Sequence, residues 1–222
     1  MRCLGPALGA LHFNAFRLPE RGALGLYDRI SMASHSCCPN CDFQFTEDGV
    51  MVVTALTDLQ PGDEITISYL SHSTLRQSTD MRTRSLRAWG FECRCARCEW
   101  PEDLSRGFCC ASPLCSGVCF LPSSSAPGEQ AVSGPCPLCG EIVAGPVLEW
   151  LLDREALYSA VLDNCRVDSG TIHELEERLF SPIAFFKQHW ILSVISEALL
   201  DPDAAPREAG QQGASETLAS HQ

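Results

Sequence analysis

The chain has 222 residues, of which 45% are hydrophobic, and a formal net charge of −12 at pH 7. This size allows one or two compact units with a moderate core and excludes the fibrous class. The acidic balance and the single lysine, Lys187, disfavour a nucleic-acid-binding surface, because phosphate neutralisation needs clustered basic residues. The sequence has no run of about twenty apolar residues, the length that predicts a membrane span. Residues 1–10 lack the apolar core of a signal peptide.

The first predicted element is a short apolar strand at His12–Phe16. Pro19–Gly25 is punctuated by Gly and Pro and predicts a turn, whereas Ile30–Ala33 predicts a short buried segment. Asn14 lies in the predicted strand, where its side chain can make local backbone hydrogen bonds.

The stretch from Met32 to Cys41 contains three thiols and an imidazole. We expect a reducing compartment, cytoplasmic and/or nuclear, where clustered thiols bind metal more often than they form disulfides. Further along, Cys93, Cys95 and Cys98 supply three thiolates, one fewer than a closed tetrahedral zinc site requires. Cys37 is the predicted fourth ligand, and Cys38 and Cys41 are predicted to be packing thiols.

Two strands, Cys41–Phe45 and Val50–Leu56, are predicted on either side of an Asp-Gly hairpin signal. After a Pro-Gly turn, Glu64–Tyr69 predicts a third strand, in which Ile65, Ile67 and the terminal tyrosine share one face. This pattern favours a small, irregular β-fold with tight turns.

Ser78–Trp89 predicts a helix that Ser78 caps and Gly90 closes. A basic segment surrounds it. A solvated helix face with ion pairs is the favoured interpretation, and a binding patch is the alternative. The arginines of this segment are Arg76, Arg82, Arg84, Arg87, Arg94 and Arg97.

From Pro101 the composition changes, and two pairs of cysteines are each followed by a glycine, as in the two knuckles of a zinc ribbon. Residues 123–134 predict a flexible loop between the pairs. Cys109 and Cys119 compete as ligands, and a first knuckle with four intervening residues is looser than one with two. The predicted ligands of this second structural zinc are Cys110, Cys115, Cys136 and Cys139.

The last third of the chain predicts helices. Val147–Asn164 has apolar residues at helical spacing, and Thr171–Glu174 is a capping box that opens a short second helix. Ser181 opens a third helix that runs to about Leu200. Residues 201–222 are rich in Ala, Gln, Glu and Ser and are predicted to be disordered.

Three motifs occur in an order that resembles a known family: His35-Ser-Cys37-x-Pro-Asn40, the strand that ends in Tyr69, and Phe91-x-Cys-x-Cys-x-x-Cys98. They resemble the C-terminal half of a SET domain with its cysteine-rich post-SET region, as found in SET-and-MYND-type protein-lysine methyltransferases. The resemblance is closest over residues 14–98, and the later helices resemble the helical repeats that follow in this family.

The resemblance implies an α+β fold: a partial SET β-fold, a post-SET zinc site, a small zinc-ribbon-like module and C-terminal antiparallel helices. The expected domains are the C-terminal part of the SET domain at 1–72, the post-SET helix and cysteines at 73–100, the zinc-ribbon-like module at 101–145, the helical region at 146–200 and the tail at 201–222.

The resemblance further implies methyl transfer from S-adenosylmethionine to a lysine of a protein substrate, histone or non-histone. Tyr69 is then the catalytic residue that orients the amine, His35 and Ser34 hold the cofactor, and Phe91 walls its pocket. Asn14 is a candidate cofactor contact, with a turn asparagine as the alternative. Both zinc ions are structural, because four thiolates leave no open position.

Two features depart from the family pattern. The family has Asn where this chain has Ser34, which lacks the paired donor and acceptor of the amide. The N-terminal SET half with its Gly-x-Gly loop, and the MYND finger, are missing, so we expect a fragment, short isoform or partial gene model with little turnover alone. A non-catalytic, zinc-stabilised interaction module is therefore the alternative function, and a nucleic-acid-binding zinc protein is the third.

Overall fold

The computed structural model describes residues 9, 11, 13–18, 21–123, 132–164 and 186–200, without the side chains of 161–164, 186, 187 and 197–200. The predicted helix at Thr171–Glu174 and the predicted tail lie outside the described residues. The described residues divide into two compact units: those up to Leu75 with Thr83–Arg97, and Arg76–Arg82 with those from Cys98 to Leu200. Within the described ranges, no helix is long and apolar enough to cross a membrane.

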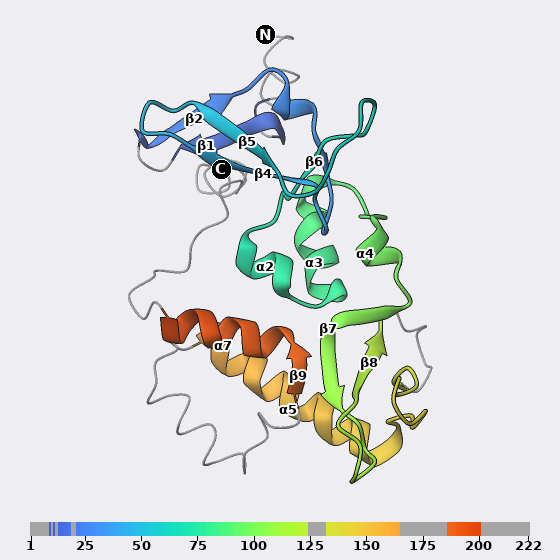
Figure 1. The fold of residues 1–222 in the computed structure, drawn as a ribbon. Helices are drawn as coiled ribbons and strands as arrows, with labels where there is room; N and C mark the ends of the chain where they lie inside the picture. Colours follow the sequence, from blue (N-terminus) through green and yellow to red (C-terminus); the bar gives the residue numbers. More distant parts are fainter. Residues whose placement is uncertain are drawn as a thin grey trace. The chain divides into compact units, whose positions relative to one another are not determined.

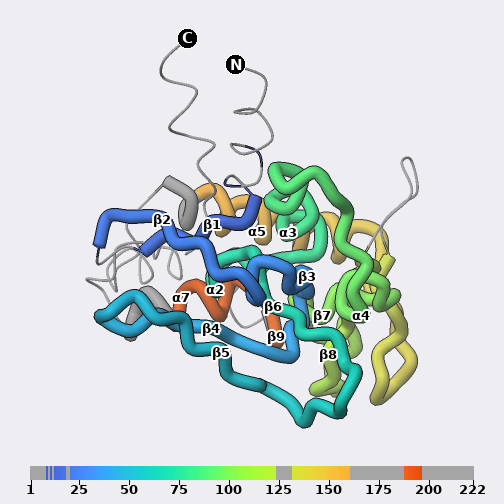
Figure 2. Tube along the Cα trace, turned by 90° about the horizontal axis from the view of Figure 1, so that it is seen from above, coloured from blue at the N-terminus to red at the C-terminus, as the bar shows by residue number. Residues whose placement is uncertain are grey.

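Two antiparallel strand pairs belong to the first unit (Figure 1). Strand β1 (Ala15–Leu18) pairs with β2 (Ala23–Leu26), and β4 (Cys41–Phe45) pairs with β5 (Met51–Ala55). The second pair confirms the predicted hairpin. Gly49 provides its turn, because a φ of 76° is readily adopted by glycine. Figure 2 shows both pairs from above, in blue to cyan.

A third pair is parallel and joins segments far apart in the sequence: β3 (Ser34–His35) lies beside β6 (Thr66–Ile67). The strand predicted over Glu64–Tyr69 therefore has only two residues in regular pairing. Its isoleucines also differ, since Ile67 is fully buried and Ile65 is 46% exposed. The expectation that both face the core is wrong for Ile65.

The side chain of Asn40 explains why this strand is short. Its Nδ2 donates to the carbonyl of Glu64, and its Oδ1 accepts the backbone N–H of Thr66, both at 2.8 Å. The amide thus takes the place of a neighbouring strand at these backbone groups. The contact of the Asn40 side chain therefore determines where β6 begins, and the periodicity of strand residues does not encode such a contact.

The core of the first unit is aromatic. Phe16 packs edge-on against three rings, at centroid distances of 5.8, 5.3 and 6.3 Å, a favourable geometry for aromatic pairs. Cys41 is buried in this cluster, as predicted for a packing thiol, whereas Cys38 is exposed, so the packing role predicted for it is wrong. The three rings belong to Tyr27, Phe43 and Phe45.

The helix predicted at Ser78–Trp89 is confirmed as α3 followed by a 3₁₀ turn. The hydroxyl of Ser78 accepts the backbone N–H of Met81 at 3.4 Å, and Gly90 ends the segment with a φ of 76°. The helical segments between β2 and β7 are η2 (Ile30–Met32), α2 (His72–Arg76), α3 (Thr79–Leu86), η3 (Arg87–Trp89) and α4 (Ala96–Glu99).

The basic segment is mostly a solvated face, as favoured by the sequence: Arg76, Arg84, Arg87 and Arg94 are exposed. Two arginines are exceptions. The side chain of Arg82 is 1% exposed, and Arg97 is partly buried and donates to the carbonyls of Leu75 at 2.7 Å and Cys37 at 3.2 Å.

The second unit contains a three-stranded antiparallel sheet in the order β8–β7–β9. The helix predicted from Ser181 is wrong over residues 186–189, which form a strand. Gln188 has a φ of 49°, which no α-helix accommodates, and α7 (Trp190–Leu200) begins directly after this strand. The strands are β7 (Glu102–Cys109), β8 (Val118–Pro122) and β9 (Phe186–His189).

Helix α5 (Gly145–Asn164) confirms the helix predicted at Val147–Asn164. Its buried positions recur at helical spacing, but one of them is the carboxylate of Glu155. One hydrophobic core includes residues from the sheet and both helices of the second unit. Its fully buried members include Phe108, Cys119, Leu121, Leu148, Tyr158 and Ile191.

Glu155 is held in this core by three side chains. Arg106 pairs with it at 2.6 Å, Trp190 Nε1 donates to it at 2.9 Å, and His189 Nε2 lies 3.4 Å away. Burial alone would raise the pKa of Glu155, but His189 and Arg106 outweigh that effect and lower the pKa to about 2. Burial lowers the pKa of His189. The carboxylate therefore joins β7, β9, α5 and α7.

Candidate functional site

The first cysteine cluster consists of the residues that the sequence grouped together. The sulfurs of Cys37, Cys93, Cys95 and Cys98 all lie within 4.8 Å of one another. Cys37 follows β3, Cys93 and Cys95 precede α4, and Cys98 lies on α4. The Cys37–Cys93 sulfur distance is 4.0 Å, close to the separation of about 3.8 Å that tetrahedral Zn–S bonds of about 2.3 Å produce.

The second cluster lies in the second unit and contains Cys110, Cys115, Cys136 and Cys139, also within 4.8 Å of one another. The Cys110–Cys139 and Cys115–Cys136 sulfur distances are 3.4 and 3.7 Å. The backbone amides of Leu138 and Cys139 lower the pKa of Cys136 to about 6. Amides aimed at a sulfur stabilise the thiolate, which is the form that binds metal.

Gly117 has no side chain, and this absence makes room for the sulfurs of the second cluster. A Cβ at this residue would lie 2.3 Å from the sulfur of Cys136 and 3.2 Å from that of Cys115. Cys119 and Cys109, the competing ligands of the sequence analysis, are not among the four converging sulfurs. Burial raises the pKa of Cys119 to about 12, which keeps it a neutral thiol.

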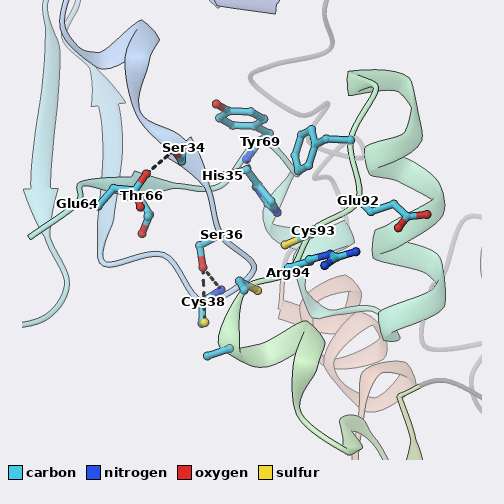
Figure 3. A pocket seen from close by; sticks show the side chains of 13 residues that line it. Ser34, His35, Ser36, Cys38, Glu64, Thr66, Tyr69, Glu92, Cys93 and Arg94 are labelled. Atoms are coloured by element: carbon cyan, nitrogen blue, oxygen red, sulfur yellow. Dashed lines mark hydrogen bonds between the residues drawn. The ribbon is translucent and has the colours of Figure 1, made fainter.

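A cavity of about 670 Å³ lies beside the first cluster (Figure 3). Four residues selected from the sequence line it: Ser34, His35, Tyr69 and Phe91. Asn14 does not line it, and its backbone carbonyl accepts a hydrogen bond from Ser31 at 3.1 Å. The lining that the sequence analysis did not select comprises Ser36, Cys38, Glu64, Thr66, Glu92, Arg94 and Ala96, with Cys93 and Cys95 from the metal cluster.

Tyr69 lies among aromatic rings with its hydroxyl directed at the backbone. The hydroxyl donates to the carbonyl of Ala33 at 2.6 Å, and the ring centroid lies 5.0 Å from Trp89 and 6.1 Å from Phe91. Burial raises the pKa of Tyr69, so the phenol stays protonated at neutral pH. Because one proton is already donated, the oxygen is left to accept a hydrogen bond.

His35 connects this tyrosine to the first cluster. Its Nδ1 accepts the backbone N–H of Tyr69 at 2.9 Å, which in a neutral ring leaves the proton on Nε2. Nε2 lies 3.3 Å from the sulfur of Cys37. A chain of two contacts thus runs from a predicted metal ligand through the imidazole to the backbone of Tyr69.

Ser34 lies at the cavity wall and donates a hydrogen bond to the carboxylate of Glu64 (Figure 3). No local pattern indicated Glu64, because the pairing of β3 with β6 brings its side chain to Ser34. A carboxylate therefore lies beside the position where the family has an amide.

Comparison with known proteins supports the resemblance. The SET domain family matches residues 11–70. The chain is 40% identical over 80 residues to a SET and MYND domain-containing protein of Dictyostelium discoideum, a match that covers 36% of this chain and 22% of that protein. It is 35% identical over 104 residues to a histone-lysine N-methyltransferase of Arabidopsis thaliana, covering 42% of this chain and 21% of the relative.

A third relative is a protein-lysine N-trimethyltransferase of Mus musculus, 42% identical over 76 residues, with coverage of 33% of this chain and 18% of the relative. The chain thus spans about a fifth of the length of the curated relatives it matches.

Proposed function

We propose that this chain, a SET domain protein of the SET-and-MYND type, forms part of an S-adenosylmethionine-dependent protein-lysine N-methyltransferase. The observation that carries this proposal is the cavity that Ser34, His35, Tyr69 and Phe91 line together. The substrate is a lysine side chain of a protein, as the names of the related enzymes indicate for those enzymes.

The cavity suits the cofactor in size and chemistry. Its volume of about 670 Å³ lies within the usual range for small-molecule sites. Aromatic rings line one side, and the Glu64 carboxylate offers a negative charge to a cationic ligand. S-adenosylmethionine, when bound, supplies a methyl group activated by a sulfonium.

Tyr69 is the proposed catalytic residue. Its hydroxyl donates to the carbonyl of Ala33, so the oxygen can accept a hydrogen bond from the lysine amine and hold the nitrogen lone pair in line. The neutral phenol is suited to this orienting role and not to removal of a proton. The rings of His35, Trp89 and Phe91 around it exclude water, and their faces favour a cationic lysine on its approach.

Both cysteine clusters are proposed to hold structural zinc. None of the described cysteines forms a disulfide, and each group of four sulfurs lies within 4.8 Å of one another, which is close enough for all four to bind one metal ion. Such sites contribute on the order of 10 kcal/mol to folding in small zinc domains. The first zinc would fix the cavity wall formed by Cys93 and Cys95.

The test begins with calorimetric titration of the zinc-loaded chain with S-adenosylmethionine. We expect saturable binding that Phe91→Ala weakens. Its absence in a folded, zinc-loaded sample would contradict the proposal and favour the non-catalytic interaction module.

The catalytic role is tested with a matched pair of variants, Tyr69→Phe and Tyr27→Phe. Both hydroxyls donate to a backbone carbonyl at 2.6 Å, so each change removes one equivalent hydrogen bond, at a cost of about 1 kcal/mol. Because we expect little turnover from this chain alone, both variants are made in a longer version that includes the N-terminal SET half. There, methyl transfer from labelled cofactor to core histones should be lost or redirected in Tyr69→Phe and kept in Tyr27→Phe. Equal rates in both variants would remove Tyr69 from the catalytic role.

A further inference from the structure

Two carboxylates and one guanidinium line the cavity beside the first cysteine cluster, those of Glu64, Glu92 and Arg94. Figure 3 shows Glu64 beside Ser34 and Thr66 on one side, and Glu92 and Arg94 on the other. All three charged residues are exposed, so a ligand that enters the cavity can reach them.

Glu64 is held in place by hydrogen bonds to its side chain and to its backbone. The Ser34 hydroxyl donates to the carboxylate, and the Asn40 side chain donates to the backbone carbonyl at 2.8 Å. Ser34 itself is paired with Thr66, two residues after Glu64, in the register of β3 and β6. Because a ligand does not have to order this carboxylate, its binding loses less conformational entropy.

The contacts of Glu64 leave its carboxylate suited to a cationic ligand. Within the described residues, the hydrogen bonds of Glu64 come from neutral groups, the hydroxyl of Ser34 and the amide of Asn40. A carboxylate only accepts hydrogen bonds, at about four lone-pair sites, and Ser34 uses one of them. A primary ammonium complements the remaining sites, because it carries a positive charge and three donors.

We propose that Glu64 and Ser34 form an ammonium-binding subsite of this cavity, in which Glu64 contacts the ligand and Ser34 is a positioning residue. This inference rests on the proposed function, because the ammonium is that of the amino acid part of S-adenosylmethionine. Arg94, on the other side of the cavity, offers a partner of opposite charge to the carboxylate of the same amino acid. The substrate lysine is the other source of a primary ammonium, and Tyr69 is the residue proposed to orient it.

The experiment measures the binding of two nucleosides to the zinc-loaded chain by calorimetry. S-adenosylhomocysteine has the amino acid and no sulfonium, whereas methylthioadenosine lacks the amino acid altogether. Glu64→Gln removes the charge at nearly constant shape, and Glu92→Gln is the control for loss of a carboxylate elsewhere in the cavity. Ser34→Ala removes the hydroxyl and Ser34→Thr keeps it. A lysine peptide, titrated with S-adenosylhomocysteine at saturation, tests the other source of an ammonium.

We expect Glu64→Gln to weaken the binding of S-adenosylhomocysteine by about 10-fold, near the lower limit for a charge-assisted hydrogen bond because Glu64 is exposed. Methylthioadenosine should bind this variant as it binds the wild type, and Glu92→Gln should match the wild type for both nucleosides. Ser34→Ala should weaken S-adenosylhomocysteine binding less than Glu64→Gln does, and Ser34→Thr should preserve it. In the Glu64→Gln background, Ser34→Ala should have no further effect, because its hydroxyl acts through the carboxylate.

Wild-type affinity for S-adenosylhomocysteine in Glu64→Gln would overturn the inference, and so would an equal loss for both nucleosides. If only the lysine peptide loses affinity, the ammonium is that of the substrate and the assignment to the cofactor is wrong. If Glu64→Gln does not fold, the comparison of Ser34→Ala with Ser34→Thr decides by the same selectivity between the nucleosides. A folded wild-type chain that binds neither nucleoside would instead reject the proposed function, and the subsite with it.

Discussion

Gly117→Ala should disrupt the second cysteine cluster, and the structure gives the size of the effect. The added Cβ would lie 2.3 Å from the sulfur of Cys136, whereas non-bonded carbon contacts require about 3.5 Å. The sulfur or the backbone must therefore move by about 1.2 Å, while zinc–ligand distances tolerate only about 0.2 Å. Overpacking costs of about 1–3 kcal/mol correspond to roughly a 5- to 150-fold loss of affinity.

The assay is chelator competition on the zinc-loaded chain, which should show one weakened zinc and one unchanged. Gly134→Ala is the matched control, because its Cβ would meet only the flexible end of the Glu102 side chain, at 3.2 Å. Retention of two zinc ions with wild-type affinity in Gly117→Ala would contradict this expectation, and so would an equal loss of zinc in Gly134→Ala.

Three further outcomes are expected. Acid should destabilise the second unit, because the unfolded chain binds protons at His189 from about pH 6.5 and at Glu155 from about pH 4.5, before the folded chain does. The Glu155 contribution, roughly 3 kcal/mol, should be lost as pH falls towards 2, and urea unfolding of Glu155→Gln should lack this slope. Asn40→Ala should lower the free energy of unfolding in urea by about 1–3 kcal/mol, since it leaves the N–H of Thr66 unpaired. Cys119→Val should keep both zinc ions by metal analysis, because this thiol is a core residue.

The sequence predicted those elements whose geometry is determined by residues close together in the chain. The Asp-Gly turn before β5, the Ser78 cap of α3 and the helical spacing in α5 each act within a few residues. The two groups of four cysteines could also be predicted, because a tetrathiolate site is defined by ligand type and number.

The features that escaped prediction depend on contacts between distant residues. The side chain of Asn40 replaces a strand partner for β6, and β9 pairs with β7, which lies far from it in the sequence. Glu155 occupies a core position of α5 because Arg106, remote in sequence, compensates its charge and Trp190 donates a hydrogen bond to it. Periodicity records which positions face the core, and it cannot record which distant partner makes a polar residue acceptable there.

Neighbouring cysteines offer the clearest test of whether the first metal site supports the cavity. Cys37 belongs to the cluster and does not line the cavity, whereas Cys38 lines the cavity and does not belong to the cluster. The sulfur of Cys37 lies 3.3 Å from His35 Nε2. The backbone N–H of Cys37 donates to the sulfur of Cys95 at 3.4 Å. Loss of the metal should therefore release the imidazole that holds the backbone of Tyr69.

We expect Cys37→Ser to reduce the zinc content from two ions per chain to one and to weaken S-adenosylmethionine binding by about 10- to 100-fold, the range seen when a supporting contact of a site is removed. Cys38→Ser should keep both zinc ions and bind the cofactor within a few-fold of the wild type, since an exposed thiol is replaced by a hydroxyl of similar size. Metal analysis and calorimetry on the same samples measure both quantities. A Cys37→Ser chain that has lost one zinc but binds the cofactor with unchanged affinity would contradict this expectation. The cavity would then keep its shape without the metal, and the contacts through His35 would contribute nothing to the free energy of cofactor binding.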